Sequence, residues 1–198
     1  MKSFILMMLM ACPLIVKSQS SMGIWGNVVN SEAGSRLELK ASKVSGNDYD
    51  LYITHRYQDI SREHYFLTVC INAKQVETFK SQLKQVKEKY DEWEKTARNN
   101  NVGEIKKEIP VAITAYDNMF GTKLSYPEKK SMKATFFVFN HAIHCNIDVS
   151  ISGYNVFQLS TWVLTSADID KIITEIDRTI QHQRNYDAQQ QRIDDLFN

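Results

Sequence analysis

Histidine, cysteine and acidic side chains are the groups in this sequence that could bind a metal or take part in acid–base catalysis. The densest group is the segment HAIHC, where His141, His144 and Cys145 supply the imidazole and thiol ligands that zinc prefers. In a β-strand, however, His141 and Cys145 point to one side and His144 to the other. A metal would therefore need ligands from a second strand, and no CxxC pair occurs. We expect no metal and no cofactor.

The sequence contains no motif of nucleophilic or phosphate-binding sites. It has no G-x-S-x-G and neither G-x-G-x-x-G nor a Walker-type loop, and its seven glycines are scattered. Some glycosidases require two carboxyl groups about 5 Å apart. The sequence spacing of the acidic pairs considered does not predict such a distance; these pairs are Asp148 with Asp168, and Asp59 with Glu63. We expect no catalytic residues. The alternative is a small secreted hydrolase without a recognisable motif.

A row of polar residues on one predicted strand is the candidate binding surface. From Ala142 to Ser152, apolar side chains at odd positions alternate with mainly polar ones. This alternation predicts an antiparallel strand with one buried face and one wet face. The expected role is non-catalytic binding of a protein, peptide or glycan, with an envelope inhibitor or immunity-type protein as a further alternative. The candidate binding residues are His144, Asn146, Asp148 and Ser150.

The N-terminal segment predicts a bacterial secretory signal peptide. Residues 4–16 form an apolar run of 13 residues, whereas a membrane-spanning helix needs about 20. Lys2 supplies the positive start, and Ser18 is a small residue suited to the cleavage site. We expect residues 1–18 to be removed between Ser18 and Gln19. The mature chain then has no transmembrane helix and lies in the periplasm or outside the cell.

A bacterial lipoprotein is the alternative reading of the same segment. Leu9-Met10-Ala11-Cys12 resembles a lipidation box, in which Cys12 would carry the lipid. The apolar run continues past this cysteine, and Met10 fits the box poorly, so cleavage after Ser18 is preferred.

The mature chain is close to neutral. Without Lys2 and Lys17 the 24 basic residues become 22, against 23 acidic ones, for a net charge of −1. Nucleic-acid-binding proteins usually carry a basic excess, so we expect no nucleic-acid partner. Two cysteines, Cys70 and Cys145, would meet an oxidising compartment. They either form a disulfide or pack as two buried thiols, and both alternatives stay open.

Two long helices are predicted from apolar stripes. In the first, apolar residues recur at spacings of three and four, after a capping residue at Asn72 with Gln75 completing a capping box. The second begins after Thr165, with Asp168 as its capping-box partner, and its mostly polar end is expected to project or fray. The stripes are Val76, Phe79, Leu83, Val86, Tyr90, Trp93 and Ala97, and then Ile169, Ile172, Ile173, Ile176 and Ile180.

The same pattern occurs twice in the chain. Three pairs of similar segments occur at nearly the same separation. The offset is 93 residues between the strand-like segments 67–71 and 160–164, and 94 residues between 49–57 and 143–151. It is 95 residues between IWG at 24–26 and MFG at 119–121. This predicts an internal duplication with a period of about 94 residues. The segment 109–116 joins the halves and could add a strand, with Pro110 at its start or on an edge.

The expected fold is therefore α+β, with two tandem ββββα-like repeats of a β-meander and a helix. The repeats, about 22–100 and 110–198, form a single domain over residues 19–198. A pseudo-twofold axis relates them, and two long helices pack on the antiparallel sheet. This order of elements is similar to that of the Pur-type nucleic-acid-binding repeats. The similarity lies in inferred topology and in no motif, so it implies the fold alone, and neutral charge and export argue against nucleic-acid binding.

Overall fold

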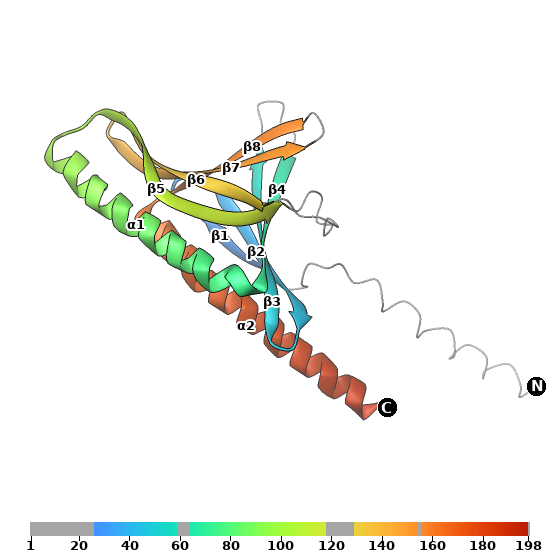
Figure 1. Cartoon of the computed structure of the whole chain (residues 1–198). Coiled ribbons are helices and arrows are strands. Elements are labelled where there is room, and N and C mark those ends of the chain that lie inside the picture. Colours follow the sequence, from blue (N-terminus) through green and yellow to red (C-terminus); the bar gives the residue numbers. More distant parts are fainter. Residues whose placement is uncertain (1–25, 59–63, 118–128, 154–155, 198) are drawn as a thin grey trace, which may run out of the picture.

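The first half of the chain folds into a four-stranded antiparallel sheet followed by a helix. The computed structural model describes residues 26–58, 64–117, 129–153 and 156–197. A short 3-10 turn, η1 (Ala73–Gln75), leads from the sheet into α1 (Val76–Asn99). The strands are β1 (Gly26–Asn30), β2 (Arg36–Ser45), β3 (Asp48–Gln58) and β4 (His64–Ile71), as Figure 1 shows.

The second half repeats this order of elements, which confirms the predicted α+β class. Each strand pairs antiparallel with the next one in the chain. Among the described residues, the two sheets join where Val69 pairs with Asp117 and Cys70 with Tyr116. The elements are β5 (Glu104–Asp117), β6 (Lys129–Phe139), β7 (Ala142–Gly153), β8 (Val156–Leu164) and α2 (Ser166–Leu196).

Residues 109–116 do add a strand, as the sequence predicted: they belong to β5, which lies between β4 and β6 and is the first strand of the second sheet. Its pairing with β6 shifts register between Glu108 and Ala112. Pro110 lies at this irregularity, and along residues 104–115 β5 pairs with β6 alone among the described strands. Pro110 is therefore on an edge, as predicted, because proline cannot donate to a ladder on both sides.

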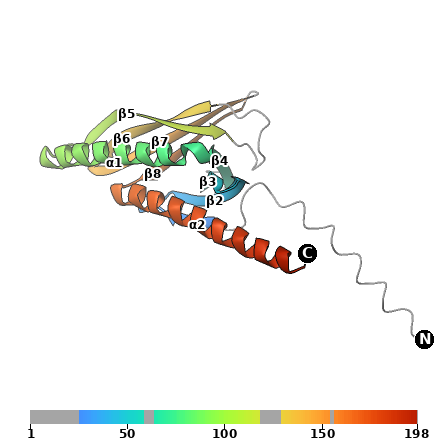
Figure 2. The ribbon, with the colours of Figure 1, turned by 60° about the horizontal axis from the view of Figure 1, so that its bottom comes forward.

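Each helix packs mainly on the sheet of the other half. α1 lies against β5 and β6, whereas α2 lies against β1 and β2. The two helices are neighbours in both Figure 1 and Figure 2. They run antiparallel, because Lys80 pairs with Asp177 while the later Lys87 pairs with the earlier Asp170. The buried apolar residues form one cluster drawn from both halves.

The predicted helical stripes are the buried faces of the helices. In α1 every stripe residue is buried except Trp93, which is partly buried. In α2 the buried face continues past Ile176 as Thr179 and Gln183. No helix in the described ranges is both long enough and apolar enough to cross a membrane.

The two helix starts differ from each other. The predicted capping box of Thr165 and Asp168 is present at α2. Asn72, by contrast, makes no side-chain cap. Instead the carboxylate of Asp50, from β3, accepts a hydrogen bond of 2.9 Å from the backbone N–H of Ala73. The sequence expectation at Asn72 was wrong: the N–H of Gln75, which the side chain would have capped, donates to the backbone carbonyl of Asn72 instead.

The turn between β1 and β2 covers part of the open edge of β8. Ser31 Oγ donates to the carbonyl of Val163 at 2.7 Å, and the N–H of Val163 donates to Ser35 Oγ at 2.8 Å. The backbone N–H of Glu32 donates to the buried Asp168 carboxylate at 3.1 Å. Serine hydroxyls thus satisfy backbone groups that an exposed edge would leave open to other strands.

Candidate functional site

The predicted polar row lies on β7, on the side turned away from the helices. Ile143, Cys145 and Ile147 are buried members of the apolar cluster. His144 and Asn146 alternate with them and are half-buried. Asp148 is also half-buried, and the side chain of Ser150 lies outside the described part. The alternation predicted from the sequence is therefore present, but the row is less exposed than a fully solvated face.

Neighbouring strands add an aromatic pair to this row. Phe137 of β6 stands directly opposite His144. Its ring stacks on that of Phe139, with centroids 6.3 Å apart and planes 9° apart. Phe139 is 51% exposed. We call this side of β5–β8 the outer face, and its defining residues are Lys106, Lys133, Phe137, Phe139, His144, Asn146 and Asp148.

Two polar atoms on the outer face have unmet hydrogen-bonding capacity. In the described part of the chain, His144 Nδ1 and Asn146 Oδ1 are buried atoms with no hydrogen-bond partner. Leaving such an atom unsatisfied costs about 1–3 kcal/mol. Asp148 differs, because its carboxylate accepts a hydrogen bond of 2.7 Å from Thr161 Oγ1.

Sequence reasoning missed the aromatic pair, although a signal for it was present. The segment KKSMKATFFVF alternates, so Phe137 and Phe139 share a side with Lys133. Trp162 of β8, by contrast, is 1% exposed and lies in the core.

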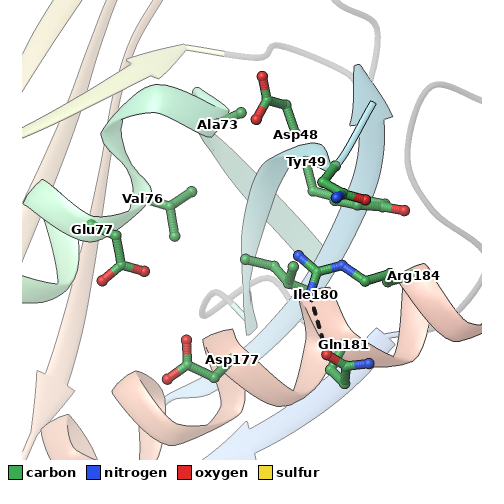
Figure 3. A pocket seen from close by; sticks show the side chains of 10 residues that line it. Asp48, Tyr49, Ala73, Val76, Glu77, Asp177, Ile180, Gln181 and Arg184 are labelled. Carbon is green, nitrogen blue, oxygen red and sulfur yellow. Dashed lines mark hydrogen bonds between the residues drawn. The ribbon is translucent and has the colours of Figure 1, made fainter. Parts of the chain in front are cut away.

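A second feature, the hairpin cleft, is a cavity of about 310 Å³ between the β2–β3 turn, the start of α1 and the middle of α2 (Figure 3). Glu77 and Asp177 line it, and Lys80 bridges them at 3.1 and 2.7 Å. Burial lowers the pKa of Lys80, but its hydrogen bonds to Asp177 and Glu77 outweigh this, so the net pKa is raised. Such partly exposed ion pairs are worth little for stability.

The structure also brings together a histidine and a serine that no motif predicted. His55 Nδ1 lies 2.6 Å from Ser160 Oγ. Burial lowers the pKa of His55 to about 4, so the imidazole is neutral at pH 7. A neutral imidazole beside a hydroxyl is the arrangement that activates a serine nucleophile. Here, however, Ser160 is 2% exposed and His55 is 6% exposed.

The residues of HAIHC do not converge on a metal. Asn140 and His141 both have positive φ, 48° and 63°, and form the two-residue turn of the β6–β7 hairpin. His141 is therefore in a turn and not in a strand, while Cys145 faces the core and His144 the outer face. No group of three potential metal ligands is found among the residues that the structure describes.

Cys70 and Cys145 are both buried, and no disulfide joins them in the structure. Cys145 lies in the core, where burial raises its pKa to about 12. Cys70 is on β4, and β5 and β6 separate β4 from β7.

The structure does not bring Asp148 and Asp168 together. Asp148 lies on the outer face, whereas Asp168 is the buried capping residue of α2. The other candidates, Asp59, Glu63, Cys12, Ser18 and Gln19, lie outside the described residues. Comparisons with known proteins found no protein-family model, no curated protein and no solved structure that matches this chain.

Proposed function

We propose that this chain is an exported, non-catalytic binding protein whose ligand lies on the outer face. The observation that carries the proposal is the exposed ring of Phe139, stacked on Phe137, on the same face as the half-buried polar side chains of His144 and Asn146. A ligand with hydrogen-bonding groups and an apolar side would complement this face. Glycans and peptides, including segments of a partner protein, have that composition. Export rests on the leader, residues 1–18.

The charge of the outer face favours a neutral ligand. Lys133 lies 3.9 Å from Glu108 and, across the next ladder, pairs in register with Asp148. Lys106 has the exposed Glu104 two residues away on the same side of β5. Because both signs are interspersed, the face has no single strong field that would attract a polyanion such as a nucleic acid.

The two halves are proposed to be a duplicated unit related by a pseudo-twofold axis. Support comes from the offset of 93 residues, which carries five buried residues of α1 onto five buried residues of α2. The two helices run antiparallel and each packs on the sheet of the other half, which also fits such an axis. The pairs are Val76 with Ile169, Phe79 with Ile172, Leu83 with Ile176, Val86 with Thr179, and Tyr90 with Gln183.

One segment of the predicted repeat falls largely outside the described residues. Gly26 begins β1, whereas residues 24, 25 and 119–121 lie outside the described part. The match between IWG and MFG therefore stays a prediction.

A binding screen with matched variants tests the proposed role. The exported chain is labelled and applied to arrays of bacterial envelope glycans and of peptides. The double variant Phe139→Ser, Asn146→Ala should reduce the signal of any true ligand at least tenfold. Val44→Ser is the control, because Val44 is also 51% exposed but lies on β2. Equal loss in both variants, or no loss in either, would contradict a ligand site on the outer face.

A small hydrolase is the second candidate, and the contact between His55 and Ser160 is the observation that favours it. The burial of both side chains opposes it, since a substrate must reach the nucleophile. Assays with ester and peptide substrates decide between the two functions. Turnover that disappears in Ser160→Ala, with the unfolding midpoint unchanged, would make the chain a hydrolase. An inhibitor or immunity-type role would instead appear as capture of an enzyme whose activity falls on binding.

A further inference from the structure

The hairpin cleft has the size and wall chemistry of a small-ligand site, separate from the outer face. Its volume of about 310 Å³ lies within the range of ligand pockets, about 300–1,000 Å³. Three segments far apart in sequence form its walls: the β2–β3 turn, the start of α1 and the middle of α2. It shares no residue with the outer face, so the two surfaces can be tested independently.

Arg184 provides hydrogen-bond donors inside this cleft. Figure 3 shows its side chain extending from α2 toward the cleft. Its guanidinium carbon lies 5.8 Å from the ring centroid of Tyr49. The Tyr49 ring is itself held, because its hydroxyl donates to Asp187 at 2.9 Å. The arginine is thus positioned by a fixed aromatic ring.

Most of the donors of Arg184 are available to a ligand. Within the described part of the chain, it donates one long hydrogen bond of 3.4 Å, to Gln181, and forms no ion pair. A guanidinium has five N–H donors in a planar fork, and two parallel ones match the oxygens of a carboxylate. The cleft therefore offers a carboxylate-binding group on its α2 wall.

The β2–β3 turn provides the opposite charge. Asp48 lines the cleft and is exposed. The other two carboxylates of the cleft, Glu77 and Asp177, already bind Lys80. Asp48 is consequently the lining carboxylate that remains to accept hydrogen bonds from a ligand cation.

We propose that the hairpin cleft binds a small zwitterion, an amino acid or a short peptide with free ends. The ligand carboxylate lies on Arg184 and its ammonium group on Asp48. Charge complementarity selects this class: a simple anion would meet three carboxylates, and a simple cation would meet the guanidinium. Because both groups are near solvent, where ion pairs are weak, we expect dissociation constants of about 1 mM.

NMR titration of the whole isotope-labelled chain tests this proposal, since it detects weak binding and locates it. Glycine, β-alanine, γ-aminobutyrate and diglycine serve as probes, because they carry both charges at increasing separation. We expect one of them to shift the signals of residues around Asp48 and Arg184 in a saturable way. Acetate and methylammonium, which each carry one charge, should bind at least tenfold more weakly than the best zwitterion.

Variants separate the two ends of the ligand. Arg184→Gln and Asp48→Asn should each weaken the best zwitterion about tenfold, whereas Arg178→Gln, a change on an exposed ion-paired arginine of the same helix, should not. The Arg184→Gln variant should bind acetate no more tightly than it binds methylammonium. The proposal is overturned if no zwitterion binds, if acetate alone binds as tightly as the best zwitterion, or if Arg178→Gln has the same effect as Arg184→Gln. Unchanged thermal midpoints establish that the variants are folded.

Discussion

His55 and Ser160 share a buried hydrogen bond, with His55 Nδ1 2.6 Å from Ser160 Oγ, across 105 residues of sequence. The histidine is on β3 of the first half and the serine is on β8 of the second. This contact and the Ser31–Val163 hydrogen bond both link the first half to the last strand. The halves are therefore joined through polar groups as well as through the apolar cluster.

Acidification should destabilise the protein through His55. Burial lowers its folded-state pKa to about 4, below the ordinary value of about 6.5 that applies when the chain unfolds. Between these values only the unfolded chain takes up the proton, so stability is complete above about pH 6.5 and falls as the pH drops toward 4. At pH 5 the free energy of unfolding, measured by urea denaturation, should be about 2 kcal/mol lower than at neutral pH because of His55. His55→Gln should remove this component, and His182→Gln, on exposed α2 surface, should retain it.

Removing the carboxylate of Asp168 should lower the free energy of unfolding by more than the loss of an exposed polar side chain does. Asp168 accepts hydrogen bonds from Thr165 and from the backbone of Glu32, and it is 2% exposed. Asp168→Ala removes a helix cap and leaves buried donors unsatisfied, so a loss of about 2 kcal/mol is expected. Chemical denaturation measures it. Asp170→Ala, which removes an exposed carboxylate two residues away, should cost less than about 0.5 kcal/mol, and equal costs would contradict the role of Asp168.

The two halves should unfold as one cooperative unit. Leu83 of α1 and Ile176 of α2 are both fully buried in the shared core. Leu83→Ala and Ile176→Ala should each reduce the free energy of unfolding by about 2–5 kcal/mol. Because each helix covers the other half's sheet, each variant should lower one common transition in calorimetry. Two separate transitions, with each variant moving only one, would show that the halves fold independently.

The thiols should be unreactive until the protein unfolds. Both are buried, and burial raises the pKa of Cys145 to about 12, so very little thiolate forms at pH 8. A thiol reagent should modify Cys70 and Cys145 slowly in the native protein and rapidly in denaturant. Cys145→Ala should leave Cys70 as the reactive one of these two. If neither residue reacts in denaturant and the protein is two hydrogens lighter by intact mass, the prediction is wrong and the two cysteines form a disulfide.

Particular residues show how far the sequence could predict the site. The alternation at 142–152 correctly separated Ile143 and Cys145 from His144 and Asn146, because side chains alternate in any strand. The same rule, applied to β6, would have placed Phe137 and Phe139 on the outer face. His141 was misplaced because its two-residue turn has no glycine, and glycine is the usual signal for positive φ. The hairpin cleft was not predicted, since Asp48, Glu77 and Arg184 belong to three separate elements.

The sequence by itself determined the periodic features: two apolar helical stripes, the alternating strands and their order in each half. These follow from the repeat of side-chain direction along a helix or strand, which is a local property of the chain. Only the tertiary structure decided that each helix packs on the other half's sheet, that Asp50 binds the backbone N–H of Ala73 in η1, and that His55 meets Ser160. The physical reason is that these contacts depend on free energies of packing between residues far apart in sequence, and such contacts leave no periodic signal in the chain.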